Sequence, residues 1–290
     1  MERDQAEGLR ERLGSHPGSP VRVIAVTSGK GGVGKTNLAA NLAVTWARQG
    51  KRVLVLDADL GLANVEILYG IKPKMHLGHL LDNPTLSLSD VLAEGPAGVR
   101  VLSAGSGVAS LSSLGHPQQQ RLLEAMEEVE NRFDLVLVDT GAGVGETVQF
   151  FVGSAQEALL VVNPEPTALT DAYASVKVLS QQGKMSRFAV VINPAAHELQ
   201  ARDIFRKLSA VCAKFLQVEL RYAGFIPRDD HVSRAVMAQR PLVEIFPQAL
   251  ASRALVHLAE FLWSQPAPRL EGGLKFLWNR LLRETSAVGS

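Results

Sequence analysis

Only one cysteine, Cys212, occurs among the 290 residues, which excludes an internal disulfide and is typical of a reducing compartment. Cys212 lies in an apolar helical pattern with Leu208, Val211 and Phe215, which favours a small core residue over a reactive thiol. A charge excess is also lacking, because the net charge is +1. Composition therefore implies no general attraction to nucleic acid or to anionic membranes, and such binding would need a local patch.

Long apolar runs are missing too. No stretch of about 18 apolar residues exists, so no segment is predicted to span a bilayer. The N-terminal sequence MERDQAEGLRERL lacks the apolar region of a secretory signal. The closest histidine pair, His76 and His79, has no acidic or cysteine ligands beside it, which favours a solvated or structural role over metal binding. We therefore expect a cytoplasmic protein that could still lie on a membrane surface.

The sequence suggests three segments. Residues 1–20 form a short helical pattern and a linker, residues 21–264 form one domain, and residues 265–290 form a second linker and a final helix. The central segment alternates apolar runs with helical patterns, which predicts an α/β fold with a doubly wound, mostly parallel sheet. The runs predicted as strands are 22–28, 52–59, 99–105, 133–141, 157–165, 188–194 and 221–227. Predicted helices include 36–49, 117–130, 170–182, 198–216 and 248–263.

A phosphate-binding motif follows the first predicted strand and opens the first helix. It matches the GxxxxGK[ST] pattern, with backbone N–H groups for phosphates, Lys35 for the β- and γ-phosphates and Thr36 for Mg²⁺. The predicted nucleotide-binding residues of the loop are Gly29, Lys30, Gly31, Gly32, Val33, Gly34, Lys35, Thr36 and Asn37. Asp139 ends a later apolar strand, as a Walker B aspartate that acts on Mg²⁺ would. ATP and Mg²⁺ are therefore the expected cofactors.

The loop contains a second lysine, Lys30, and with it the sequence KGGVGKT resembles the deviant Walker A motif of the MinD/ParA family of ATPases. Residues 57–70, DADLGLANVEILYG, resemble the switch I of that family, and residues 139–146, DTGAGVGE, resemble its switch II. Gly141 replaces the proline usual in MinD itself, and DTGAG is instead similar to the flagellar branch called FlhG or FleN. The resemblance covers residues 21–264.

The resemblance implies a role for several positions. Lys30 would reach the phosphates of a partner in an ATP-bound homodimer, Asp59 would orient the attacking water, and Asp57 would support the region around Mg²⁺ and Thr36. Asn193 and the segment Pro227, Arg228 and Asp229 would hold adenine, and Glu165 would contact nucleotide across the dimer. From the residues alone, Lys30 could equally be a solvated loop charge or bind phosphates of its own subunit, and Asn193 and Pro227 could serve only in turns.

The C-terminal stretch LKFLWNRLL has an apolar stripe beside basic residues, which is typical of a helix lying on a membrane surface. A helix docked on the domain is the alternative. MinD-like proteins end in a membrane-targeting helix, so the resemblance favours peripheral binding to the anionic inner face of the cytoplasmic membrane when ATP is bound. The residues predicted to enter the membrane are Leu274, Phe276, Leu277, Trp278, Leu281 and Leu282.

The N-terminal stretch DQAEGLR, residues 4–10, is similar to the DQAxxLR activator motif of FlhG proteins. In that family the motif binds the flagellar GTPase FlhF and stimulates hydrolysis, which implies Gln5, Leu9 and Arg10 as partner-binding residues. Flagellar basal-body proteins or a flagellar transcription regulator are further implied partners. A ParA-like DNA-segregation ATPase is the alternative, but basic clusters are sparse outside 269–283, so nucleic acid is not expected. A MinD that positions the division site is a third possibility, against which the N-terminal extension counts.

Overall fold

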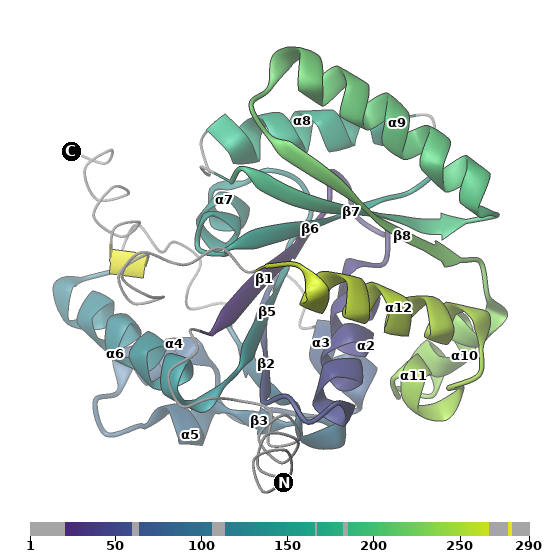
Figure 1. Ribbon diagram of the computed structural model, residues 1–290. Coiled ribbons are helices and arrows are strands. Elements are labelled where there is room, and N and C mark those ends of the chain that lie inside the picture. The colour runs from purple at the N-terminus through teal and green to yellow at the C-terminus, as the bar shows by residue number, and fades with distance from the viewer. Residues whose placement is uncertain are drawn as a thin grey trace, which may run out of the picture.

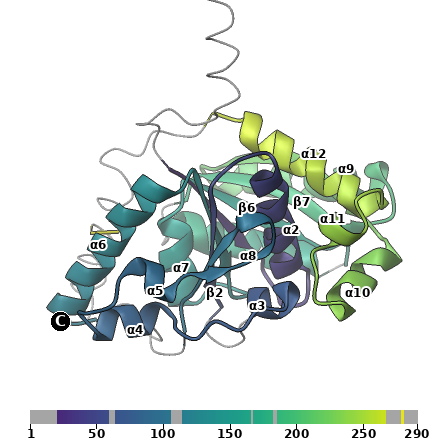
Figure 2. The same cartoon turned by 90° about the horizontal axis from the view of Figure 1, so that it is seen from below.

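The computed structural model describes residues 21–59, 64–105, 114–165, 167–181, 185–266 and 278–279. These residues form an eight-stranded sheet in the order β3-β4-β2-β5-β1-β6-β7-β8, with helices on both faces (Figures 1 and 2). All described pairings are parallel except that of β3 with β4. The predicted doubly wound α/β fold is confirmed.

The seven predicted strands are all present, and the short β3 joins them as an antiparallel edge. The strands are β1 Arg22–Thr27, β2 Val53–Ala58, β3 Ala93–Glu94, β4 Arg100–Ser103, β5 Leu135–Thr140, β6 Glu157–Val162, β7 Arg187–Ala195 and β8 Glu219–Pro227. The central strands β1, β2, β5 and β6 are buried along their whole length. Such burial follows from their unbroken apolar sequences, because helices cover a parallel sheet on both faces.

The helices divide between the two faces. Helices α2, α3, α10, α11 and α12 contribute to the core on one face, and α4 to α9 contribute to the core on the other. The helices are α2 Lys35–Arg48, α3 Asn64–Tyr69, α4 Leu77–Asp82, α5 Leu88–Val91, α6 His116–Arg132, α7 Glu146–Gly153, α8 Ala168–Gln181, α9 Glu198–Phe215, α10 Asp230–Met237, α11 Leu242–Ile245 and α12 Leu250–Ser264, with a 3₁₀ turn at Pro96–Gly98.

Helix α2 lies deepest in the structure. Most of its residues are buried, and its many alanines let it approach both the sheet and α12 closely. Trp46 has no exposed surface and donates from its indole nitrogen to the carbonyl oxygen of Ala259, 3.2 Å away on α12. The helix that starts at the phosphate loop is therefore held rigidly, which fixes the direction of its N-terminus.

The end of α12 is fixed by charged side chains near the amino ends of the strands, opposite the phosphate loop. Glu157 on β6 is 2% exposed and forms ion pairs with both Arg22 and Arg221. Arg22 also donates to the carbonyl oxygen of Trp263, 3.1 Å away. These contacts fix the place where the chain leaves the domain toward its C-terminal segment.

Candidate nucleotide-binding site

The phosphate loop connects β1 to α2, and two of its glycines lie in close contact with residues from other elements. Gly34 has φ 88°, and a Cβ there would lie 2.5 Å from the side-chain nitrogen of Asn193, so a side chain is excluded on two grounds. A Cβ at Gly29 would lie 2.5 Å from the backbone of Asp171 in α8. Helix α2 has neither a side-chain cap nor an acidic residue in its first turn. Its N–H groups therefore remain available to an anion.

Lys35 lies inside the site. It is 7% exposed, and burial lowers its pKa, while the charges of Asp139 and Asp59 oppose that shift. An ammonium group held next to carboxylates in a low dielectric gives a strong field for phosphate oxygens. Lys35 and the two aspartates predicted around it are thus brought together.

Asp139 at the end of β5 is fully buried. Neither carboxylate oxygen has a hydrogen-bond partner of ordinary geometry among the described residues. Burial raises the pKa of Asp139 to about 7, and the neighbouring Thr36 hydroxyl partly opposes the rise. A buried carboxylate with so little hydrogen bonding fits a cation, and Thr36 is the residue that would supply a second oxygen ligand to Mg²⁺.

Asp57 on β2 pairs in register with Asp139 on β5. One of its oxygens accepts from the backbone N–H of Asp59, and the other accepts from those of Asn64 and Val65, each at 3.2 Å. Burial raises its pKa to about 6. Asp57 therefore holds the switch I backbone near the site at Asp59 and again at Asn64 and Val65.

Asp59 and switch II lie together. A Cβ at Gly141 would be 3.7 Å from a carboxylate oxygen of Asp59, which places Asp59 beside the first residues after β5. The backbone N–H of Gly143 donates to the carbonyl oxygen of Ser28 in the phosphate loop, at 3.0 Å. Switch II thus contacts the loop directly, so a change in the loop on nucleotide binding can be transmitted to it.

Lys30 points away from this buried cluster. Its side chain is 30% exposed and forms an ion pair with Glu165, whose pKa it lowers. The hydroxyl of Ser28 donates to the carbonyl oxygen of Lys30, at 2.7 Å, and fixes the turn. The two lysines of one loop therefore occupy different places, Lys35 in the interior and Lys30 at the rim.

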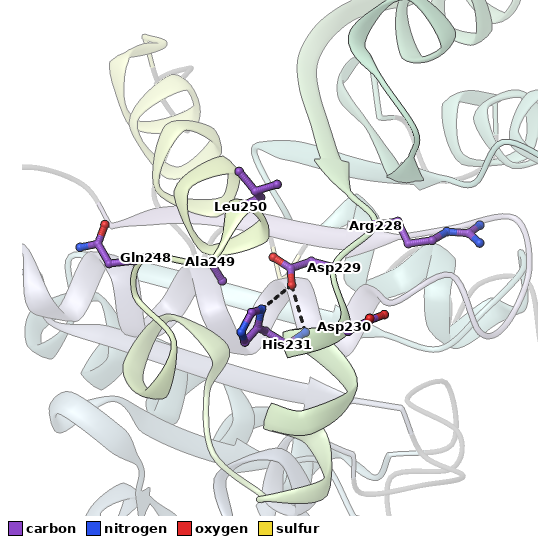
Figure 3. Close-up of a pocket in the computed structure, with 7 residues that line it drawn as sticks. All are labelled: Arg228, Asp229, Asp230, His231, Gln248, Ala249 and Leu250. Carbon is purple, nitrogen blue, oxygen red and sulfur yellow. Dashed lines mark hydrogen bonds and ion pairs between the residues drawn. The ribbon is translucent and has the colours of Figure 1, made fainter.

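The positions expected to hold adenine lie at the carboxyl ends of β7 and β8. Asn193 donates from its side-chain nitrogen to the carbonyl oxygen of Val33, at 2.7 Å, and so connects β7 to the phosphate loop. Pro227 ends β8, and Arg228 and Asp229 line a cavity of about 570 Å³ with Asp230, His231 and residues 248–250 (Figure 3). The contribution of residues 248–250 to this cavity was not expected from the sequence, because they belong to no recognisable motif.

Several predicted residues are not described by the structure. Gln5, Leu9 and Arg10 lie outside the described residues, as do Leu274, Phe276, Leu277, Leu281 and Leu282. Trp278 is described and is 2% exposed. Its ring packs edge-on against Phe150 and Phe151 of α7, with centroids 5.1 and 5.8 Å apart. No helix in the described ranges is long and apolar enough to cross a bilayer.

A doubly wound sheet with a phosphate loop after β1 and a buried aspartate near the end of β5 defines a P-loop nucleotide-binding protein. Residues 24–242 match the model of the CobQ/CobB/MinD/ParA nucleotide-binding domain, and the chain belongs to this family. The predicted membership of the MinD/ParA ATPases is confirmed.

Similar proteins agree with this assignment. The chain is 46% identical to the antiactivator FleN of Pseudomonas aeruginosa over 93% of this chain and 96% of FleN. It is 33% identical to the flagellum site-determining protein YlxH of Helicobacter pylori, over 90% of both chains. MinD in the MinC:MinD cell division protein complex of Aquifex aeolicus superposes with a TM-score of 0.68 at 27% identity, covering 87% of this chain and 99% of that one. This chain is thus a homologue of flagellar regulators within the MinD/ParA family.

Proposed function

We propose that this protein is a slow ATPase that dimerises when it binds ATP and thereby regulates the number or placement of flagella. The observation that carries the proposal is the separation of the two loop lysines. Lys35 is buried beside Asp139, as phosphate binding requires, whereas Lys30 lies at the rim, where a second protomer could meet it. The identity to FleN, which extends over nearly the whole of both chains, supports the flagellar role.

Within one protomer, the chain supplies a complete phosphate site. The loop amides, the N-terminus of α2 and Lys35 bind the phosphates, and Thr36 and Asp139 hold Mg²⁺. When bound, the metal neutralises charge on the phosphate oxygens. Asp59 is placed next to switch II, where its carboxylate can hold the water that attacks the γ-phosphate.

Hydrolysis then depends on the partner. The pair between Lys30 and Glu165 is solvent-exposed, and such pairs contribute little stability. Phosphates of a partner protomer, with their higher charge, can therefore take Lys30 from Glu165. A cation delivered by the partner stabilises the charge of the transition state only in the assembled dimer, which makes turnover conditional on dimerisation. Glu165, once released, is free to contact the nucleotide of the partner.

Membrane binding depends on the same change between the nucleotide states. In this conformation Trp278 is buried on α7, so a role of the C-terminal segment on the anionic membrane requires its release. Helix α7 starts at Glu146, the last residue of switch II, and switch II contacts the phosphate loop. The buried indole nitrogen of Trp278 lacks a hydrogen-bond partner among the described residues, which lowers the stability of docking. The protein then moves from the cytoplasm to the inner face of the membrane when ATP binds.

The partners follow from the N-terminal motif. Residues 4–10 bind an FlhF-type GTPase through Gln5, Leu9 and Arg10 and stimulate its hydrolysis. Basal-body proteins or a flagellar transcription regulator then respond to the ATP-bound state. ATP hydrolysis by the central domain limits how long that state lasts.

Size-exclusion chromatography with light scattering tests the proposal. An Asp59→Ala variant should run as a dimer with ATP and as a monomer with ADP, because it binds ATP but does not hydrolyse it. Adding Lys30→Ala to this variant should leave ATP bound and the protein monomeric. A double variant that still dimerised with ATP would contradict the role of Lys30.

A further inference from the structure

His231 lines the cavity beyond β8 and is held in one orientation there (Figure 3). Its Nδ1 lies 2.7 Å from a carboxylate oxygen of Asp229, and the same oxygen accepts from the backbone N–H of His231, at 3.0 Å. The second oxygen of Asp229 accepts from the N–H of Ala251, at 3.1 Å. Phe246 packs against the imidazole, with centroids 4.7 Å apart, and Arg234 covers the same Phe246 ring at 4.9 Å.

These contacts fix the tautomer of the ring. The backbone and histidine donors hold the pKa of Asp229 below its usual range despite partial burial, so this carboxylate is charged and can only accept hydrogen bonds. The Nδ1 of His231 must therefore carry a proton and donate it. In the neutral ring, Nε2 is then an acceptor. Nε2 makes no hydrogen bond to the described residues, and the side chain is 42% exposed at the cavity.

The strand order places the end of β8 at a distance from the phosphate loop that a nucleotide can span. The loop follows β1 and the cavity follows β8, three strands away in the order β1-β6-β7-β8. Adjacent strands lie about 4.8 Å apart, so the two positions are about 14 Å apart across the sheet. An extended nucleoside triphosphate covers a span of this order, and Asn193 at the end of β7 lies between them.

We propose that His231 selects adenine over guanine. Its Nε2 lone pair accepts a hydrogen bond from the exocyclic amine of adenine, whereas guanine presents a carbonyl oxygen at that position, and two acceptors repel each other. The inference rests on the proposed ATP-binding function and assigns a specificity-determining residue to it. Asp229 then acts through His231, because it decides which ring nitrogen is protonated.

Binding of the hydrolysis-resistant analogues ATPγS and GTPγS, each with Mg²⁺, tests this role by calorimetry at pH 8. A His231→Phe variant keeps a flat ring but removes the acceptor. Its affinity for ATPγS should fall roughly fivefold while that for GTPγS stays unchanged or rises, the size expected for one hydrogen bond. His257→Ala is the matched control, because His257 is an exposed histidine further along α12. Thermal unfolding without nucleotide shows whether each variant is folded.

The outcomes separate the two proposals. A wild-type protein that binds neither analogue would overturn the ATP-binding function and the role of His231 together. Wild-type preference for ATPγS that persists in His231→Phe would overturn only the role of His231. An equal loss of affinity for both analogues in a folded variant would also overturn it, since the ring would then serve packing rather than selection.

Discussion

Replacing Asp139 by asparagine separates two effects of this carboxylate. Without ligand its charge lowers the free energy of unfolding, and with ligand it binds Mg²⁺. Burial raises the pKa of Asp139 from 3.8 to about 7, which corresponds to roughly 4 kcal/mol of unfavourable free energy for the charged form. Asparagine removes this cost but also removes a counter-charge from the buried Lys35. The net gain in the free energy of unfolding should be about 2 kcal/mol at pH 8, or about 5 °C in Tm.

The direction of the pKa shift of Asp139 predicts how the stability of the protein changes with pH. The folded pKa of Asp139 lies above its unfolded value, so the folded protein retains a proton that the unfolded chain releases. Stability of the wild type therefore falls as the pH rises from about 4 to about 7, and the advantage of Asp139→Asn should grow from pH 5 to pH 8. Mg²⁺ and ATP should stabilise the wild type by about 3 kcal/mol at a hundredfold excess over Kd and stabilise the variant much less.

Differential scanning fluorimetry with and without Mg²⁺ and ATP measures both effects. Glu260→Gln is the control, because it removes a carboxylate from the exposed face of α12. If ligand-free Asp139→Asn melted below the wild type at pH 8, this would refute the reasoning that the buried charge of Asp139 destabilises the ligand-free protein. A normal response to Mg²⁺ and ATP in the variant would refute the assignment of Asp139 to the metal.

Three further changes test other parts of the structure. Gly29→Ala should abolish ATP binding and lower Tm, because its Cβ would lie 2.5 Å from the backbone of Asp171. Gly145→Ala is the control and should do neither, because its Cβ would have no atom within 4 Å. Equal effects of the two changes would contradict the close packing of the loop on α8. Deletion of 274–290 should leave ATP-dependent dimers intact but abolish sedimentation with anionic liposomes, and unchanged pelleting would show that the segment is only structural. A peptide of residues 1–20 should accelerate an FlhF-type GTPase, and no acceleration at saturating peptide would eliminate the activator role.

The strands and long helices could be predicted because their apolar patterns are continuous. The short helices α3, α4, α5, α7, α10 and α11 were not among the helices predicted, since four to eight residues carry too little periodicity to be distinguished from loops. The phosphate loop and Asp139 were predictable because their motif fixes local geometry. The contact of Gly29 with Asp171 was not, because it joins residues 142 positions apart through tertiary packing.

The environment of single residues also required the structure. The sequence identified Asp57 as a residue near the metal, but only the structure shows that both of its oxygens accept hydrogen bonds from the switch I backbone. Trp278 was predicted to enter a membrane, and its burial depends on contacts with Phe150 and Phe151 of α7, more than a hundred positions earlier. His231 belongs to no motif, and its role follows from the position of Asp229.

The central claim is that Lys30 acts on the nucleotide of a partner, and mixing two inactive variants tests it most directly. Lys30→Ala keeps its own Asp59 but has no lysine to deliver, whereas Asp59→Ala delivers Lys30 but cannot hydrolyse. In a mixed dimer, the site of the Lys30→Ala protomer receives Lys30 from its partner and is complete. ATP turnover per Lys30→Ala protomer should therefore rise as Asp59→Ala is titrated into it. If Lys30 acts on its own subunit, both sites of the mixed dimer are defective, and turnover that stays at the level of the separate variants would contradict the account.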